Sequence, residues 1–553
     1  ILAGVVTIGD YAFQRCSELA TVTFETGSQL ATMGKGAFSS CSALTGFAFQ
    51  PGVTAIADSL LSGCGKLAAV TFEPGFAPES IGADAFSGCT VLSALPIPES
   101  VTVIGDYAFQ NCDALTEMAI PELVTAIPDN CFNNCDGLTA VTFGEQVTSI
   151  GASAFYGCAK LTTLPEEDAE GIVIPETVTT LGKQAFYGCK AVTKVTLPDV
   201  ITEIPESLFY RCAALDTVTL GSAVTKIGAS AFRNCTALES IDLPDTLTTL
   251  GSSAFSDSGL TSVTLPDGLT KLPNYGFSGC KRLTSVTLSP DTVALDRGTF
   301  YGCTALTAIT LPAGVTEIPQ AAFMNCTALE TVTPKGVLTA IGYQAFSGCT
   351  SLRFAIPETV VSIGGQAFKG CAALTEISIP EGVTELAANV FQDCDGLTEV
   401  TIPATVGKFN ASAFAGCDNL TTVTLGGSPT AVPNAMFDGC TALTTIRLPD
   451  SVTTIGDSAF RDCTALTSID IPSGVTKIGN YAFQSSGLTS VVLPDTVTSL
   501  GTSVFQDCAA LTSATVGEGI AAISNYTFRD CTALAEVTLP AGLKEIGIYA
   551  FQN

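Results

Sequence analysis

The chain has 553 residues, and its 23 Lys and Arg against 52 Asp and Glu give a formal net charge of −29. Because it contains no His and so few basic residues, it lacks the basic face that holds a phosphate backbone, which excludes nucleic acid as a partner. Its apolar residues are spread singly, with no run of the roughly 18 that a transmembrane helix requires. We therefore expect no membrane insertion within these residues.

One unit recurs from end to end. It is seen in residues 231–244, AFRNCTALESIDLP, and its anchor Phe returns after 22 or 23 residues in almost every copy. A repeat of this length cannot bury its own apolar positions, so neighbouring copies must stack and share one core. We expect a single solenoid over residues 1–553, with about 23 to 24 repeats. Because Ile1 and Asn553 both fall within a unit, we expect a piece of a longer protein, truncated mid-repeat at both ends.

Within the unit, the elements follow a fixed order. Residues 238–243 alternate inward and outward positions, which predicts a strand, and stacked copies predict a parallel sheet. After a turn at Pro244, residues 247–250 predict a second, shorter strand. The segment around each anchor, for instance residues 228–235, is too short for a full helix and predicts one helical or 3₁₀ turn with its Phe, here Phe232, facing the core. The one long gap between anchors holds an acidic insertion at residues 164–174, with Glu166 to Glu170, which we expect to form a surface loop.

The 22 cysteines follow the same period. All but Cys131 lie three residues after an anchor. In coils about 4.8 Å apart their side chains point in parallel, so the Cβ atoms lie farther apart than the roughly 3.8 Å of a disulfide. Ser258 and Ser486 replace two members, which a paired framework would resist. We therefore expect buried free thiols and no disulfides, and the absence of C-x-x-C spacing argues against a metal site.

The pattern L-x-x-V-x-L-P-x-x-V-x-x-I-G-x-x-A-F-x-x-C closely resembles the BspA-like leucine-rich repeats, over the whole chain. The resemblance implies a right-handed solenoid with a concave parallel β-sheet of short strands and with 3₁₀ or helical turns on the other faces. It also implies a secreted or surface-exposed protein of a bacterium or unicellular eukaryote, acting in adhesion and recognition. The family offers no shared catalytic residues.

Little in the chain supports catalysis. His, the commonest general base, is absent, and no G-x-S-x-G or phosphate-binding loop interrupts the repeat. We expect no enzyme and no cofactor. In eleven units the residue after Pro is acidic, which suits a turn. A sharper interpretation of this column is weak calcium binding, at Asp245 and Asp267 for example.

The outward positions of the main strand are mostly Thr and Ser, which β-propensity alone explains. Such arrays can also order water against ice, but Lys194, Glu376 and Val492 interrupt the ladder. A polar face with few aromatic anchors favours weak, multivalent contact. The candidate ligand-binding residues on this face are Ser240, Asp242, Ser262, Thr264, Ser285, Thr287, Thr422, Thr424, Arg447 and Asp470.

Five sequons permit N-glycosylation if the source has a secretory pathway. Asn410, Asn419 and Asn525 are the better acceptors, because Cys occupies the middle position after Asn234 and Asn325. The sequence thus predicts an extracellular or cell-surface scaffold that binds protein or glycan ligands. The alternative is a structural fibre or cell-envelope component in which copies associate with one another and carry glycans.

Overall fold

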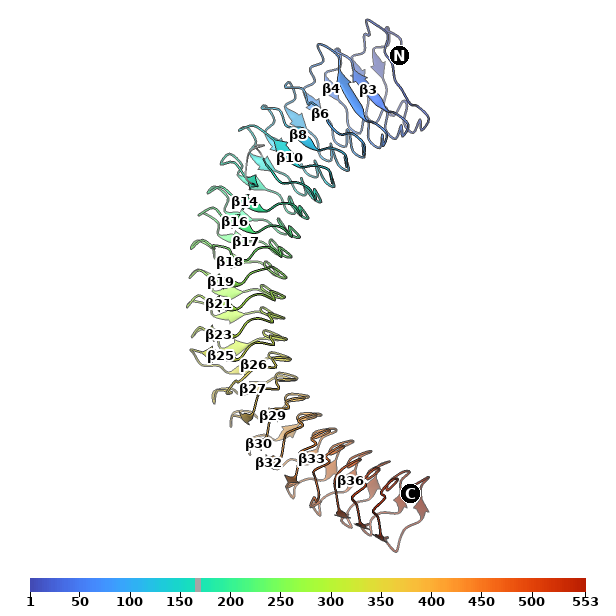
Figure 1. The fold of residues 1–553 in the computed structure, drawn as a ribbon, viewed down its shortest axis with the longest axis vertical. Coiled ribbons are helices and arrows are strands. Elements are labelled where there is room, and N and C mark those ends of the chain that lie inside the picture. The colour runs from blue at the N-terminus through green and yellow to red at the C-terminus, as the bar shows by residue number, and fades with distance from the viewer. Residues whose placement is uncertain (165–170) are drawn as a thin grey trace. The chain divides into compact units, whose positions relative to one another are not determined.

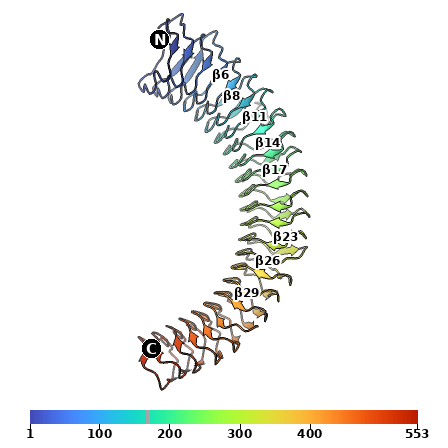
Figure 2. The same ribbon diagram turned by 180° about the vertical axis from the view of Figure 1, so that it is seen from behind.

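The computed structural model describes residues 1–164 and 171–553; the predicted acidic insertion, Glu166 to Glu170, lies outside the described residues. The chain divides into two compact units, Ile1–Ser289 and Pro290–Asn553. Within each unit, successive copies of the repeat form coils that lie side by side, as both views show (Figure 1, Figure 2). The stacked parallel solenoid predicted from the period is confirmed, whereas the hand of the coil, the concavity of its sheet and the single-body organisation of residues 1–553 stay predictions.

Each coil contributes a second strand and most also contribute a main strand, and each strand pairs in parallel with a counterpart one repeat away. Lys194, for example, lies opposite Thr217 in the main ladder, and Lys226 lies opposite Thr249 in the second. In the main strand Lys194–Thr196 the central Val195 is fully buried and its two neighbours are not. This is the inward and outward alternation that the sequence predicts.

In the first unit the main strands are β3 (Gly46–Phe49), β5 (Ala69–Phe72), β8 (Glu117–Ala119), β10 (Ala140–Thr142), β12 (Ile172–Val173), β14 (Lys194–Thr196), β16 (Thr217–Thr219), β19 (Ser262–Thr264) and β21 (Ser285–Thr287). Its second strands are β1 (Thr7–Ile8), β2 (Thr32–Met33), β4 (Ala55–Ile56), β6 (Ser80–Ile81), β7 (Val103–Ile104), β9 (Ala126–Ile127), β11 (Ser149–Ile150), β13 (Thr180–Leu181), β15 (Glu203–Ile204), β17 (Lys226–Ile227), β18 (Thr249–Leu250) and β20 (Lys271–Leu272).

In the second unit the main strands are β23 (Ala308–Leu311), β25 (Thr331–Pro334), β28 (Glu376–Ser378), β30 (Glu399–Ile402), β32 (Thr422–Leu425), β34 (Thr445–Ile446), β37 (Ser490–Val492), β39 (Ser513–Thr515) and β41 (Glu536–Thr538). Its second strands are β22 (Ala294–Leu295), β24 (Glu317–Ile318), β26 (Ala340–Ile341), β27 (Ser362–Ile363), β29 (Glu385–Leu386), β31 (Lys408–Phe409), β33 (Ala431–Val432), β35 (Thr454–Ile455), β36 (Lys477–Ile478), β38 (Ser499–Leu500), β40 (Ala522–Ile523) and β42 (Glu545–Ile546).

The predicted main strand at residues 238–243 does not form. Ile241 is buried and Asp242 exposed, as the alternation requires, but no main strand is present between β16 and β19. The coil around Ile469, which also reads Ser-Ile-Asp, lacks its strand as well. Asp is among the residues least favoured in strands, and it occupies the outward position in both coils. The alternating pattern therefore predicts which side chains are buried, but it does not ensure that the main strands form hydrogen bonds with their neighbours.

The predicted helical or 3₁₀ turn before and after each anchor is also wrong: the described residues contain no helix, and a run of β-turns takes its place. Around Phe232, the amides of Arg233 and Cys235 bond within the run, to Ser230 and Phe232. The amides that alternate with these, of Ser230, Phe232 and Asn234, bond to the next coil, as from Phe232 to Ala254 at 2.8 Å. A helix would turn all of these amides along its own axis. Here every second one joins two coils.

This alternation requires left-handed backbone at two positions in each coil, two residues before and two residues after the anchor. Ser230 and Asn234 have φ of 56° and 60°, and Gly298 and Gly302 occupy the same places around Phe300. Gly adopts such angles freely, whereas residues with a Cβ carry a cost, and a branched Cβ carries the largest. The positions are held by Gly in some coils and by Ser, Asn, Asp, Tyr, Gln, Arg or Ala in others.

We expect Ser485→Val to destabilise the second unit by about 1–2 kcal/mol, because Ser485 has a φ of 53° and a β-branched residue is strained there. Ser485→Gly should leave stability within about 0.5 kcal/mol of the parent, since Gly adopts this angle freely. Urea unfolding of the two variants measures the difference. Equal stability of the Val and Gly variants would contradict the left-handed assignment.

The core of each unit is a stack of anchor rings. Phe232 lies between Phe209 and Phe255, with ring centroids 5.6 and 5.4 Å apart and ring planes within 21° of parallel. All three rings are fully buried. Each anchor thus packs against the coil before it and the coil after it, which is why a single coil has no core of its own.

Candidate functional site

The thiols lie beneath the turns, and most donate a hydrogen bond to a main-chain carbonyl of the coil before their own. The Cys235 Sγ donates to the carbonyl of Phe209 at 3.2 Å, and Cys326 donates to Phe300 at 3.0 Å. All cysteines are free, and every one except Cys16 is buried. Burial raises the pKa of the Cys212 thiol to about 12, despite the opposing effect of a backbone hydrogen bond. A thiol in this state is neither a nucleophile nor a metal ligand at neutral pH, so the row is structural.

We expect one thiol to react with iodoacetamide in the native protein at about pH 8, because Cys16 is exposed and the other thiols are buried with raised pKa values where a shift is resolved. In denaturant without reductant, all 22 should react. Intact-mass spectrometry counts the added groups. A denatured count well below 22 would reveal disulfides and overturn the prediction of free thiols.

The carboxylates that follow Pro cap the next coil in some units. Asp199 accepts a hydrogen bond from the amide of Ser222 at 2.7 Å, and Asp495 does the same for Glu518 at 2.9 Å. Hydrogen bonding to Ser222 lowers the pKa of Asp199. Asp245 and Asp267 are exposed, and among residues 1–164 and 171–553 no three acidic or Cys side chains gather as a metal site would require. Turn capping accounts for the observed contacts of the carboxylates that follow Pro, and calcium binding by them stays a prediction.

A second set of inter-coil caps was not anticipated. Three residues before the anchor, an Asp or Asn side chain accepts a hydrogen bond from the main-chain amide at the same position of the next coil. Asp129 receives the amide of Ala152 at 2.6 Å, and Asn480 receives that of Thr502 at 2.9 Å. The sequence signal was present, because Asp and Asn recur there, but the partner lies one full repeat away.

The ten predicted face residues do lie on the outer side of the main strands or of the coils between them, and all are exposed except the half-buried Thr422. In the first unit β19 and β21 bring Ser262 opposite Ser285 and Thr264 opposite Thr287. Ser240 and Asp242 belong to the preceding coil, which lacks a main strand. The first-unit candidates thus lie side by side on the outer side of neighbouring coils.

In the second unit four of the predicted residues meet at one hollow. Thr422, Thr424, Arg447 and Asp470, together with Thr445 and Ser468, line a depression of about 320 Å³. The depression lies where the main sheet β28-β30-β32-β34 ends and the coil around Ile469 follows without a strand. A cation and a carboxylate therefore flank a row of hydroxyl groups, which can donate to and accept from a polar ligand.

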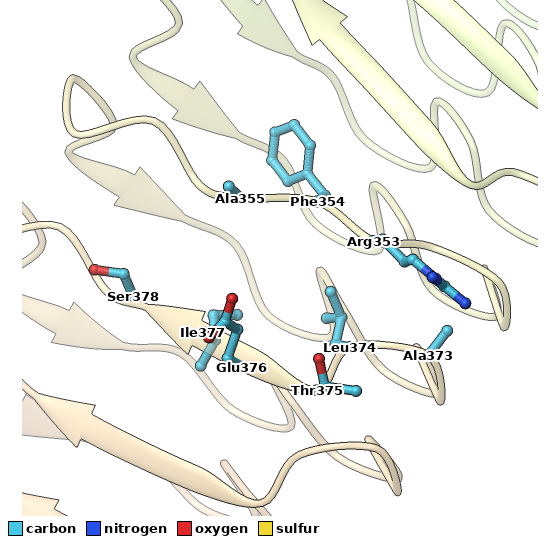
Figure 3. A pocket seen from close by; sticks show the side chains of 9 residues that line it. All are labelled: Arg353, Phe354, Ala355, Ala373, Leu374, Thr375, Glu376, Ile377 and Ser378. Atoms are coloured by element: carbon cyan, nitrogen blue, oxygen red, sulfur yellow. The ribbon is translucent and has the colours of Figure 1, made fainter.

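A larger hollow, of about 790 Å³, was missed by sequence reasoning. Its lining includes Arg353, Phe354 and Ala355 from one coil and Glu376 and Ser378 from the next (Figure 3). The signal was one missing residue between Leu352 and Pro357, which shortens this repeat to 22 residues. The shortening removes the main strand, so that among the described residues the sheet β23-β25 ends before this coil and a new sheet starts at β28.

The shortened coil also changes which side chain faces inward. Phe354 is 5% exposed and its ring lies 5.4 Å from that of Phe346, while Arg353 points to the opposite side of its segment (Figure 3). The hollow thus has an apolar floor, with Phe354 and Ile377, and a rim that carries Arg353 and Glu376. An apolar floor with a few polar groups at its rim is the usual make-up of a ligand site.

Comparison with known proteins places these features in a family. Six copies of the BspA type leucine rich repeat region match residues 1–78, 76–169, 165–284, 253–356, 353–467 and 430–553. The chain belongs to the BspA-type leucine-rich repeat family. The resemblance noted in the sequence is therefore confirmed. The anchors, thiols and strands described above belong to copies of this family's repeat.

Two solved structures match this chain over most of their own length. A leucine-rich repeat protein from Bacteroides ovatus is 22% identical, with 79% of this chain and 86% of that chain covered and a TM-score of 0.45. A leucine rich cell surface protein from Faecalibacterium prausnitzii is 23% identical, with 76% and 87% covered and a TM-score of 0.35. No curated protein gives a match.

The sequons of this BspA-type chain differ in access. Asn419 is exposed, and its Nδ2 donates to the carbonyl of Asp395 at 2.8 Å. Asn410 is half-buried, with Nδ2 bonded to Glu385 and to the main chain, and Asn525 is exposed but is followed by the fully buried Thr527. Asn234 and Asn325 are half-buried. Glycosylation stays a prediction, and Asn419 and Asn525 are the sequon Asn residues that are exposed.

In the part of the chain that the structure describes, no helix is long and apolar enough to span a membrane.

Proposed function

We propose that this BspA-type protein is an extracellular or cell-surface recognition scaffold, which binds protein or glycan ligands through many weak contacts along the outer side of its main strands. The observation that supports the proposal is the pair of hollows in the second unit. Both lie where a main strand is lost, and both set a cation and a carboxylate beside hydroxyl or apolar groups. Local departures from a repeat are where specificity is expected, since the repeat itself is fixed by stacking.

The chemistry of the two hollows suits ligands rich in amides and hydroxyl groups. Arg353 and Arg447 can bind carboxylates or carbonyl oxygens, and Glu376 and Asp470 can accept from ligand N–H or O–H groups. The side chains of Thr and Ser between them add donors and acceptors at each coil. Each contact is small, but a ligand that repeats along the surface engages several at once, and the effective concentration of the later contacts is high.

The proposal is tested by binding of the purified protein to immobilised collagen, fibronectin and a glycan array, with and without calcium. We expect Arg353→Ala with Glu376→Ala, or Arg447→Ala with Asp470→Ala, to weaken any binding about fivefold or more, as loss of roughly 1 kcal/mol of contact implies. A matched control removes the same charges from the second strands, with Glu317→Ala and Lys477→Ala. Equal loss in the control, or no binding to any of these probes, would contradict the assignment of this face.

A second candidate is a structural role in which copies of the chain associate. The observation that favours it is a row of three stacked Tyr side chains on the turns of the first unit, at Tyr156, Tyr187 and Tyr210. Tyr and Arg are enriched in protein interfaces, and this row ends in Arg.

A further inference from the structure

One stretch of the turns in the first unit carries side chains that the fold does not need. Directly after the anchors, Tyr156 and Tyr187 stack with ring centroids 4.4 Å apart, and Tyr187 and Tyr210 stack at 4.8 Å. The next coil continues the row with Arg233, whose guanidinium carbon lies 5.7 Å from the Tyr210 centroid, and Arg211 lies 5.4 Å from the same ring. We call these five residues the tyrosine–arginine ladder.

The ladder is not explained by packing of the coil. At the same position the neighbouring coils carry Asn133 and Ser256, and their anchors are buried just as fully. The three Tyr side chains and Arg233 are half-buried, because each covers the next, and Arg211 is exposed. Partial burial and the neighbouring phenol of Tyr156 raise the pKa of Tyr187, so its hydroxyl stays protonated and can donate. The ladder therefore presents ring edges, hydroxyl donors and guanidinium groups.

The charge around the ladder opposes that of the chain. The turns of the ladder coils also carry Lys160, Lys183 and Lys190, in addition to Arg211 and Arg233. The acidic groups on these turns and on those of the two flanking coils are Asp129, Asp136, Glu206 and Asp257, and Asp257 lies 3.6 Å from the Nε of Arg233. At physiological salt, charges beyond about 8 Å are screened, so an approaching surface meets this local positive charge more than the net −29.

The first unit carries a complementary surface at another corner of its coils. Five consecutive coils place an exposed carboxylate at one equivalent position, in the turn after the main strand. We call Glu99, Glu122, Glu145, Glu176 and Asp199 the carboxylate column. The coils that carry Glu145 and Glu176 are direct neighbours, since β11 pairs with β13. The column therefore repeats once per coil, as the ladder does.

Charge alone would allow either an acidic peptide or a second copy of the chain to bind the ladder, and the spacing of the carboxylates distinguishes the two. An extended acidic peptide presents side chains on one face every second residue, roughly 6.7 Å apart. The ladder steps at 4.4 and 4.8 Å between its rings. A second solenoid of the same repeat presents one carboxylate per coil, at the rise that sets the ladder itself, so several rungs can be matched at once.

We infer that the tyrosine–arginine ladder docks the carboxylate column of a second copy of this chain. The contact joins two different surfaces, so it is heterologous and can propagate from copy to copy. It is small, and each single contact is weak. The outer side of the main strands takes no part, so the inference stands whether or not that face binds ligands.

Zero-length crosslinking with a carbodiimide tests the contact, with an equal mixture of isotope-labelled and unlabelled protein so that links between copies are distinguished by mass. We expect amide links between copies that join Lys183 or Lys190 to Glu122, Glu145 or Glu176. Arg211→Glu with Arg233→Glu should reduce these links about tenfold, because two attractive charges become repulsive. Lys477→Glu with Lys544→Glu makes the same charge change elsewhere and should leave them unchanged.

A charge swap makes the test specific. Mixing the Arg211→Glu, Arg233→Glu protein with a Glu122→Lys, Glu145→Lys protein should restore links between the two, and circular dichroism should show that all variants stay folded. The inference is overturned if the unmodified protein forms no such links, if the links persist in the arginine variant, or if the swap fails to restore them. It is also overturned if poly-glutamate binds the ladder while copies of the chain do not.

Discussion

The protein is expected to unfold steeply as the pH rises from about 9 to about 11, because its buried thiols cannot ionise in the fold. Burial raises the pKa of the Cys212 and Cys326 thiols from 9.0 to about 12. In the unfolded chain the same thiols lose their protons near pH 9. Their contribution to stability is therefore intact below pH 9 and is lost between about 9 and 12, at about 1.4 kcal/mol per pH unit for each thiol.

The effect accumulates because the thiols occupy consecutive coils. Cys189, Cys212 and Cys235 follow one another, and burial raises the pKa of all three. Together they should cost about 4 kcal/mol per pH unit in one stretch of the stack. Circular dichroism between about pH 8 and 11 follows the loss of structure, and hydrogen exchange locates it along the chain.

The matched control replaces these three thiols by Ser, which the chain itself carries at Ser258 and Ser486. Both natural Ser side chains are buried, and Ser258 bonds to the Cys280 thiol at 3.3 Å. In the triple variant the coils from Phe186 to Phe232 should stay closed to a higher pH than in the parent. Opening of these coils at the same pH in both proteins would show that Lys or Tyr titration, and not the thiols, causes alkaline unfolding.

Phe232→Ala is expected to lower local stability by about 3–5 kcal/mol, since the ring is fully buried and its removal leaves a cavity between two coils. Because both neighbouring rings lose a stacking partner, the loss should open the middle of the first unit before the rest. Limited proteolysis should cut within a few coils of residue 232, and hydrogen exchange should quicken there.

Phe551→Ala is the control for the anchor variant. Phe551 stacks on one side only, against Phe528 at 5.2 Å, and it is 36% exposed. Its truncation should change melting little. Unchanged proteolysis of the Phe232 variant would show that stacking of the anchors is not what holds neighbouring coils together.

The period of the sequence predicted the stack and its interior, because inward positions are constrained in every coil. Phe232, Cys235 and Leu238 are all fully buried, as their recurrence implies. The turns were mispredicted because a short Ala-Phe segment resembles a helix when only side-chain burial is considered. Ser230 and Asn234 share no side-chain chemistry with Tyr275 or Gln344, which adopt the same left-handed conformation in other coils. The left-handed positions therefore could not be recognised from residue type.

Part of the candidate site could likewise be predicted from the sequence, and part could not. Thr422, Thr424, Arg447 and Asp470 were predicted from their outward positions, and the structure places them around one hollow. The hollow at Arg353 could not be predicted from composition, because it arises from a missing residue and from the loss of a ladder that depends on the neighbouring coil. The tyrosine–arginine ladder was visible as Tyr after three successive anchors, but its meaning required the stacking distances.

The loss of the main strand around Ile241 has a mechanical consequence. At this step the coils still join through the turns, as from the amide of Phe232 to the carbonyl of Ala254, but the main-strand rungs between them are gone. Tension along the stack is shared by the bonds at each step, so a step with fewer bonds yields first. We therefore expect this step, like the one at residues 92–97, where the main strand is also absent, to open early when the first unit is pulled along its stack.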